Sequence, residues 1–210
     1  MSFVPISESR VGSGKQAVRA AVTDHLTDPE VSRVVVAPTG ADGADAFLSL
    51  VIATLMLAER LDVEVAYTPP AATRATRIYR LPHGSAAQTL AEHGSARDVP
   101  LIRDDAASVL VGVARHLGAD DEKLHGETYV DSEHLFTGEV RGVQIEPLPH
   151  APGLRARVIR PIWPGRWHLG RAAQTGGTNI VVEREGTLTP RVLKRSTFYR
   201  HHVDMKLVCP

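Results

Sequence analysis

Residues 33–44 read RVVVAPTGADGA, and this stretch decides the fold class. Its first five residues are typical of a short strand that is buried on both faces, and the glycines after them predict a turn. Residues 44–60 have the length and apolar content of a helix, and residues 62–67 alternate like a second strand. Strand, glycine turn, helix and strand make up the repeating unit of an open, mostly parallel α/β sheet.

Outward from this unit, the pattern divides the chain into two halves. A helix is predicted over residues 14–26, a strand over 75–81, and a helix from the turn at 82–85 through 92. Beyond residue 108, short strands are predicted at residues 127–131, 138–146, 154–160, 179–183, 192–199 and 203–208. We therefore expect an α/β nucleotide-binding-like domain at 1–106 and a basic, antiparallel, sandwich-like β domain at 107–210.

Composition favours a soluble cytoplasmic protein. The chain has one cysteine, Cys209, which excludes an internal disulfide framework and suits a reducing compartment. Residues 1–14 lack the basic and apolar pattern of a signal peptide. The longest apolar stretch, residues 44–58, is shorter than the ~20 residues that span a bilayer, so no transmembrane segment is expected.

Charge is balanced over the whole chain but uneven along it. From Arg155 onward, 11 Lys and Arg stand against 3 Asp and Glu, whereas the preceding residues carry 13 basic and 21 acidic side chains. Such a concentration of like charge costs self-repulsion unless something anionic lies near. Two interpretations stay open: the halves neutralise each other, or the basic segment binds an anionic ligand.

Two glycine turns are candidate phosphate-binding loops. Gly40, Asp42 and Gly43 lie where the buried strand meets the long helix, and Gly84 and Ser85 lie at the next predicted helix start. Backbone N–H groups at helix starts attract phosphate oxygens, and turns at one edge of an open sheet face a common crevice. Asp42 is a candidate to fix the turn, hold a cation or cap the helix, and Ser85 is a candidate N-cap. Ordinary strand-to-helix loops use the same residue types, so a purely structural role stays open.

Residues 170–179 are predicted to form a polar, glycine-rich loop within the basic segment. Arg171, with the N–H groups of the nearby glycines, is a candidate to cradle a phosphate. Trp163 and Trp167 precede this loop and would either stack on a base or pack in the core. Residues 194–202 mix cations with aromatic rings as nucleic-acid surfaces do, although a strand would divide them over two faces.

One predicted strand face carries groups that suit a divalent metal or acid–base chemistry. His125, Glu127 and Asp131 alternate on one side of a strand, and His134 follows in the turn. A solvent-exposed polar face is the ordinary alternative.

Residues 12–16, GSGKQ, are a weaker phosphate-loop candidate. Ser9 stands where a phosphate loop needs a glycine, and Gln16 stands where it needs Ser or Thr. No strand is predicted before this segment either, so we expect a lead into the first helix.

With these motifs the chain resembles the superfamily of diacylglycerol kinases, sphingosine kinases and NAD kinases. The hallmark of that superfamily, strand, Gly-Gly-Asp-Gly-Thr and helix, is similar to residues 34–44, and its second motif, Pro-x-Gly-Thr-x-Asn-Asp, is similar to residues 82–88. Residues 143–154 are similar to a strand and turn of its sandwich domain, and the end of the chain, residues 207–210, also resembles it. The resemblance implies a nucleotide-binding α/β domain, a β-sandwich domain and an active site in the cleft between them, with ATP and Mg²⁺ as cofactors.

The departures from these motifs concern groups that order a nucleotide and its metal. Ala41 and Ala44 replace a glycine and the threonine of the first motif, and Ala87 and Gln88 replace the Asn-Asp of the second. The leading hypothesis is therefore a lipid-kinase-like protein that binds a nucleotide or another phosphate-bearing small molecule or lipid and need not transfer phosphate. Asp42 would be its metal-linked or catalytic acid, and the ligand would be bound by Gly40, Gly43, Gly84, Ser85 and Arg171.

Two other classes of function stay open. A non-enzymatic interaction protein would use its basic second half to bind nucleic acid or an acidic partner. A metal-assisted hydrolase would use the strand face that carries His125, Glu127, Asp131 and His134.

Overall fold

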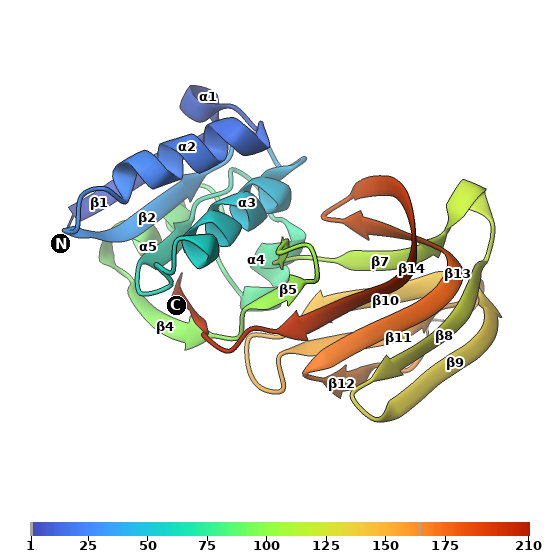
Figure 1. The fold of residues 1–210 in the computed structure, drawn as a ribbon. Coiled ribbons are helices and arrows are strands. Elements are labelled where there is room, and N and C mark those ends of the chain that lie inside the picture. Colours follow the sequence, from blue (N-terminus) through green and yellow to red (C-terminus); the bar gives the residue numbers. More distant parts are fainter. Residues whose placement is uncertain (1, 164) are drawn as a thin grey trace. The chain divides into compact units, whose positions relative to one another are not determined.

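Five strands form the sheet of the first unit of the structure, in the order β1-β2-β3-β15-β4 (Figure 1). They are β1 (Ser2–Ser7), β2 (Val31–Ala37), β3 (Glu64–Tyr67), β15 (Met205–Cys209) and β4 (Ser95–Val99). The first four run parallel, and β4 pairs antiparallel with β15. The parallel α/β sheet predicted from residues 33–67 is therefore confirmed.

The chain divides into two compact units, and the computed structural model describes residues 2–163 and 165–210. The first unit extends to Val99 and includes Val203–Pro210, whereas the second comprises Pro100–His202. The sequence placed the boundary between residues 106 and 107 and assigned all later residues to the second domain. The structure differs because β15 returns to the first sheet, where it lies between β3 and β4.

Helices cover both faces of the first sheet. They are α1 (Glu8–Val11), α2 (Lys15–His25), α3 (Ala44–Leu57), α4 (Arg74–Tyr79) and α5 (Ser85–His93). α2 and α3 pack side by side on one face (Figure 1). On the other face, Ala91 of α5 packs with Ala66 of β3 and Val208 of β15. None of the described helices has the length and apolar character needed to cross a membrane.

Several elements of the first unit differ from the prediction, and α1 and β4 were not predicted. Residues 75–81 were expected to form a strand, but α4 begins there, because Thr73 and Thr76 form a reciprocal capping box at its start. β1 was not expected at all. It is a partly exposed edge strand in which Ile6 is the only buried side chain, so its apolar pattern is weak.

The second unit is an antiparallel sheet of ten strands. Its main order is β12-β11-β10-β7-β13-β14-β5-β6, and β8 pairs with β13 and β9. The strands are β5 (Ile102–Asp104), β6 (Val109–Leu110), β7 (Ala114–Gly118), β8 (Leu124–Val130), β9 (Glu133–Val140), β10 (Gly142–Pro147), β11 (Leu154–Ile159), β12 (His168–Gly170), β13 (Ala172–Arg184) and β14 (Thr187–Arg200). A short 3-10 helix, Ala119–Asp121, follows β7. The predicted fold class, an α/β part with a β-rich part, is confirmed.

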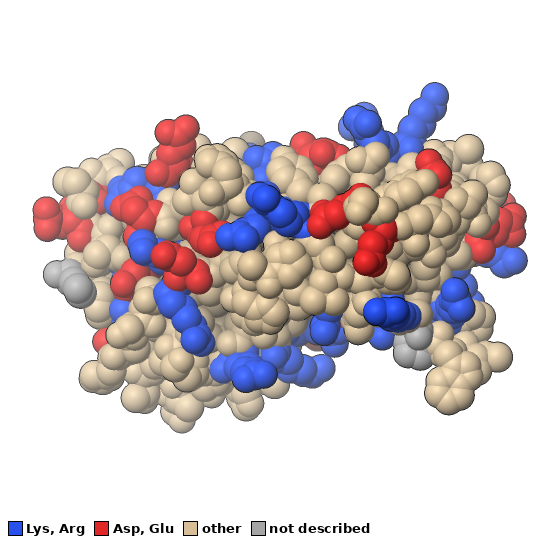
Figure 2. All heavy atoms as spheres, turned by 90° about the horizontal axis from the view of Figure 1, so that it is seen from below, with Lys and Arg blue, Asp and Glu red and all other residues tan. Residues whose placement is uncertain are grey.

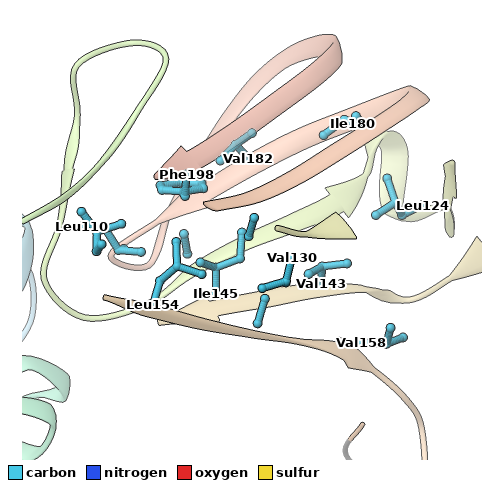
Figure 3. Close-up of a cluster of buried hydrophobic side chains, with 14 of the residues drawn as sticks. Leu110, Leu124, Val130, Val143, Ile145, Leu154, Val158, Ile180, Val182 and Phe198 are labelled. Atoms are coloured by element: carbon cyan, nitrogen blue, oxygen red, sulfur yellow. The ribbon is translucent and has the colours of Figure 1, made fainter. Parts of the chain in front are cut away.

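The long strand β13 organises the core of this unit. Residues 173–177 pair with β8 and residues 180–184 pair with β7, and the register with β14 shifts between the two stretches. Two branches of the sheet therefore leave the same strand and enclose a common apolar core. Figure 3 shows this core, which includes Leu124 and Val130 of β8, Ile145 of β10 and Phe198 of β14.

Candidate functional site

Three turns lie at the carboxyl edge of the parallel sheet. β1, β2 and β3 run parallel, so the segments that follow them, at residues 8–14 (which include α1), 38–43 and 68–73, lie at the same edge. Glu8 joins the first two turns, because its Oε2 accepts hydrogen bonds from the backbone N–H and the Oγ1 of Thr39 at 2.8 and 2.9 Å. This edge is where open α/β sheets usually bind their ligands.

The turn after β2 is built by Gly43. This residue is the N-cap of α3 and has φ 75°, a left-handed conformation that favours glycine. Asp42 is exposed beside it, and no described side chain caps the helix. The proposed capping role of Asp42 is therefore wrong. Its carboxylate remains at the helix start for another role.

Asp45, which the sequence interpretation missed, links three elements at this edge. Its Oδ1 accepts a hydrogen bond from the hydroxyl of Tyr67, at the end of β3, at 3.0 Å. Its Oδ2 accepts one from the N–H of Ala75, in the first turn of α4, also at 3.0 Å. An acid in the first turn of a helix can be recognised in the sequence. The partners of Asp45 could not be predicted, because they lie 22 and 30 residues away along the chain.

The turn before α5 lies next to the end of β3. The N–H of Gly84 donates to the carbonyl of Pro69 at 2.8 Å. Gly84 has φ 63° and is the N-cap, whereas Ser85 is the exposed first residue of the helix. The prediction that Ser85 caps α5 is wrong, because the positive φ of the cap position favours glycine.

α2, α3 and α5 share one property at their starts. Their N-cap residues are Gly14, Gly43 and Gly84, and none of the three receives a side-chain cap from the described residues. α4 differs, because Thr73 caps it. The first N–H groups of an uncapped helix need acceptors from elsewhere and carry the positive end of the helix dipole. Starts of this kind at one sheet edge favour the binding of phosphate groups.

The segment at residues 12–16 also belongs to this edge. It was set aside partly because no strand was expected before it, but β1 precedes it. The spacing of a phosphate loop is still absent. Lys15, in the first turn of α2, is exposed and adds a positive charge near this helix start.

The stretch around Arg171 is not a loop. Residues 172–176 pair with β14 on one side, and residues 173–177 pair with β8 on the other. The N–H groups of Arg171 and Ala172 donate to the carboxylate of Asp131 at 2.9–3.0 Å. The predicted glycine-rich cradle over residues 170–179 is therefore wrong, because its backbone is part of a sheet. A ligand contact by the side chain of Arg171 stays a prediction.

The proposed metal face has mainly structural partners. His125, Glu127, Asp131 and His134 are all exposed on or beside β8 and β9. Asp131 accepts the backbone bonds just described, and Nε2 of His134 is 2.8 Å from Oγ1 of Thr137. Within residues 2–163 and 165–210, no three His, Cys, Asp or Glu side chains are grouped to hold a metal ion. The hydrolase alternative therefore has no ligand set here.

The basic segment is largely neutralised within its own unit. The second unit contains 14 Lys and Arg and 12 Asp and Glu, a net charge of +2, and the first unit contains 10 and 12, a net charge of −2. Its ion pairs include Arg155–Glu146, Arg184–Asp104 and Arg115–Glu183. Figure 2 shows acidic and basic side chains interspersed on the face in view. The expectation of a strongly basic domain is thus corrected, because strands from the basic segment pair with strands that carry acids.

A buried polar network crosses the core of the second unit. Nδ1 of His116 lies 2.6 Å from Oγ1 of Thr175, which lies 2.7 Å from Oγ1 of Thr128. All three side chains are buried, and Nε2 of His116 has no hydrogen-bond partner among the described atoms. Burial, with a smaller contribution from Arg184, lowers the pKa of His116 from 6.5 to about 3. His116 is therefore neutral near pH 7.

Comparison with known proteins supports the fold. No protein-family model matches the chain, and no curated protein matches it significantly by sequence. The fold matches a diacylglycerol kinase from Bacillus anthracis with a TM-score of 0.70 and 11% identity, over 100% of this chain and 97% of that chain. It also matches an NAD kinase from Archaeoglobus fulgidus, solved in complex with ATP, with a TM-score of 0.60 and 10% identity, over 99% and 93% of the two chains.

Proposed function

From the fold shared with diacylglycerol and NAD kinases, we propose that the first unit binds the phosphate groups of a nucleotide at the carboxyl edge of its parallel sheet. The observation that carries the proposal is the pair of glycine-started helices α3 and α5 at one edge, which no described side chain caps. Asp45 is bonded to Tyr67 and Gly84 is bonded to Pro69, so each start is connected to the end of β3 or to the turn after it. The backbone N–H groups at the start of each helix and the positive ends of the two helix dipoles attract an anion.

Each predicted residue of the first unit has a defined part in this proposal. Gly40 and Gly43 let phosphate oxygens approach the backbone of the first turn, and Gly84 and Ser85 do the same at the second. Asp42 is the only acid in residues 38–44 and 82–85. Mg²⁺ is commonly held by one or two carboxylates together with substrate phosphates and water. Asp42 would therefore hold the Mg²⁺ that accompanies ATP, and the metal would neutralise phosphate charge there.

We propose binding without efficient phosphoryl transfer. Transfer depends on precisely placed metal ions and charges, more than on any covalent group of the protein. Ala44, Ala87 and Gln88 supply neither a carboxylate nor a hydroxyl where the two resembling motifs carry a threonine, an asparagine and an aspartate. A cytoplasmic protein that senses or sequesters a phosphorylated small molecule or lipid fits these substitutions.

Calorimetric titration with ATP and Mg²⁺ tests the proposal. We expect binding below millimolar ATP, and at least about tenfold weaker binding by Ser85→Asp, because the new carboxylate repels phosphate at the start of α5. Folding should be retained, since an acid in the first turn of a helix is favourable. Ser95→Asp is the matched control: it makes the same change at an exposed position beyond the other end of α5.

Two results would refute the proposed function. One is the absence of binding heat at millimolar ATP, and the other is equal affinity of Ser85→Asp and the wild type. Release of ADP measured in the same samples, with and without lipid, separates binding from transfer. Sustained turnover that Asp42→Asn abolishes would overturn the part of the proposal that excludes efficient transfer.

A further inference from the structure

A loop of the second unit exposes two large apolar side chains. It connects β11 to β12 and carries Ile162 and Trp163, which are 82% and 79% exposed. Single exposed apolar residues are common, but two adjacent ones of this size form a patch that usually marks an interaction site.

Two exposed arginines flank these residues along the chain. Arg160 and Arg166 are exposed on either side of them. Arg155 and Arg157 of β11 stack on Trp167, near the end of the same loop, each with its guanidinium carbon 4.3 Å from the ring centroid. Residues 147–182 contain five Arg and no Asp or Glu. Glu146 pairs with Arg155 and Glu133 lies beside His168 of β12, so the positive charge of the patch comes from the exposed Arg160 and Arg166.

The apolar character continues onto the sheet next to the loop. Leu169 of β12 pairs with Arg155 of β11, so the two side chains share a face, and Leu169 is 53% exposed. In Figure 2, uncharged side chains project from the lower right, with Lys and Arg side chains beside them. We call Ile162, Trp163 and Leu169, with the flanking Arg160 and Arg166, the Ile-Trp patch.

We propose that the Ile-Trp patch binds the surface of an anionic lipid bilayer. Trp163 would lie at the headgroup boundary, where indole rings are favoured because they are apolar and also carry an N–H donor. Ile162 would gain by leaving water, and the two arginines would contact lipid phosphates.

The isoleucine argues for lipid over nucleic acid. Single-stranded nucleic acid also binds arginines and tryptophans, through its phosphates and through stacking on bases. Nucleic acid offers no comparable apolar environment for Ile162, which is more exposed than Trp163. The proposal concerns residues of the second unit only, and it stands whether or not the first unit binds ATP.

Cosedimentation of the full chain with vesicles tests the proposal. We expect binding at low salt to vesicles of equal parts phosphatidylglycerol and phosphatidylcholine, and much weaker binding to pure phosphatidylcholine. The double variant Ile162→Ser, Trp163→Ser should lower the affinity at least about tenfold. Arg160→Gln and Arg166→Gln should each lower it about fivefold.

Fluorescence reports insertion directly. The chain has two tryptophans, so Trp167→Phe leaves Trp163 as the single emitter while an aromatic ring still stacks on the two arginines. Its emission should shift to shorter wavelength when anionic vesicles are added. Leu188→Ser is the control, because Leu188 is also exposed but lies on β14, and four strands lie between β14 and β12 in the sheet order.

Three outcomes would overturn the proposal. They are no sedimentation with anionic vesicles at low salt, no loss of binding in the Ile162→Ser, Trp163→Ser variant, and tight binding of single-stranded oligodeoxythymidine that Ile162→Ser leaves unchanged. ATP titration of the same variants keeps this test separate from that of the proposed function, since substitutions in the loop should not alter nucleotide affinity.

Discussion

Replacement of His116 by leucine should reduce the sensitivity of the fold to acid. The folded-state pKa of His116 is about 3, below its ordinary value of 6.5, because the ring is buried and lies near Arg184. The unfolded chain therefore binds a proton between these two pH values that the folded chain does not. Stability from this group is complete above pH 6.5 and is lost as the pH falls toward 3.

The size of the effect follows from this shift. One pKa unit corresponds to about 1.4 kcal/mol, so at pH 5 the wild type should have lost about 2 kcal/mol of unfolding free energy through His116 alone. Leucine fills a similar volume, cannot titrate, and leaves the hydroxyls of Thr175 and Thr128 paired with each other. The free energy of unfolding of His116→Leu should therefore fall about 2 kcal/mol less than that of the wild type between pH 7 and 5.

Urea unfolding at pH 7, 6 and 5 measures this difference. The other titrating groups are common to both proteins and cancel in the comparison. His125→Gln is the control, because His125 is exposed on β8 and its replacement should leave the pH dependence close to that of the wild type. If the free energy of unfolding of His116→Leu and of the wild type fell equally between pH 7 and 5, the reasoning would be refuted, whatever the difference in stability between the two proteins at pH 7.

Three further substitutions test contacts described above. Asp45→Ala removes the acceptor of two hydrogen bonds and should lower the free energy of unfolding by about 2 kcal/mol in urea titrations. Arg184→Ala leaves the buried carboxylate of Asp104 without its cation and should cost about 3 kcal/mol, seen as a lower Tm. Glu8→Gln removes the negative charge of the carboxylate that accepts the N–H of Thr39. The affinity for ATP, measured by calorimetry, should rise up to about fivefold, because that charge no longer repels phosphate.

Local signals predicted the first unit well. The apolar run at residues 33–37 and the glycines after it specify β2, the turn and α3, because each depends on neighbours within a few residues. The capping box of Thr73 and Thr76 was an equally local signal for α4, and the strand predicted at residues 75–81 overlooked it. The hydrogen bonds that connect the segments at the sheet edge, such as that between Asp45 and Ala75, join residues 30 positions apart and could not be predicted from the sequence.

Glycines misled the prediction in the second unit. The glycines in residues 170–179 suggested a loop, but Gly177 faces Gly126 across β13 and β8. A Cβ at Gly126 would lie 2.0 Å from the carbonyl oxygen of Gly176, and one at Gly177 would lie 2.4 Å from that of His125. β8 and β13 can therefore lie this close together only because both positions are glycine. The requirement comes from strand pairing, which sequence order does not reveal.

Charge counted along the chain was also a poor guide. The excess of basic residues after Arg155 is real, but a count along the chain ignores which strands become neighbours. Arg184 meets Asp104, which lies 80 residues earlier. Even residues 147–182, which contain no acid, meet acids of other strands, since Glu146 pairs with Arg155 and Glu133 with His168.

The position of β15 has a consequence for synthesis on the ribosome. The other four strands of this sheet lie within residues 1–99, whereas β15 begins at Met205. The first sheet therefore cannot be completed until about 100 more residues have been synthesised. At ~5–20 residues per second, that delay lasts roughly 5–20 s. Throughout it, β3 lacks its neighbour and presents an unpaired edge, which other nascent chains or a chaperone can contact. The second unit, which is contiguous in sequence, can fold before the first is closed.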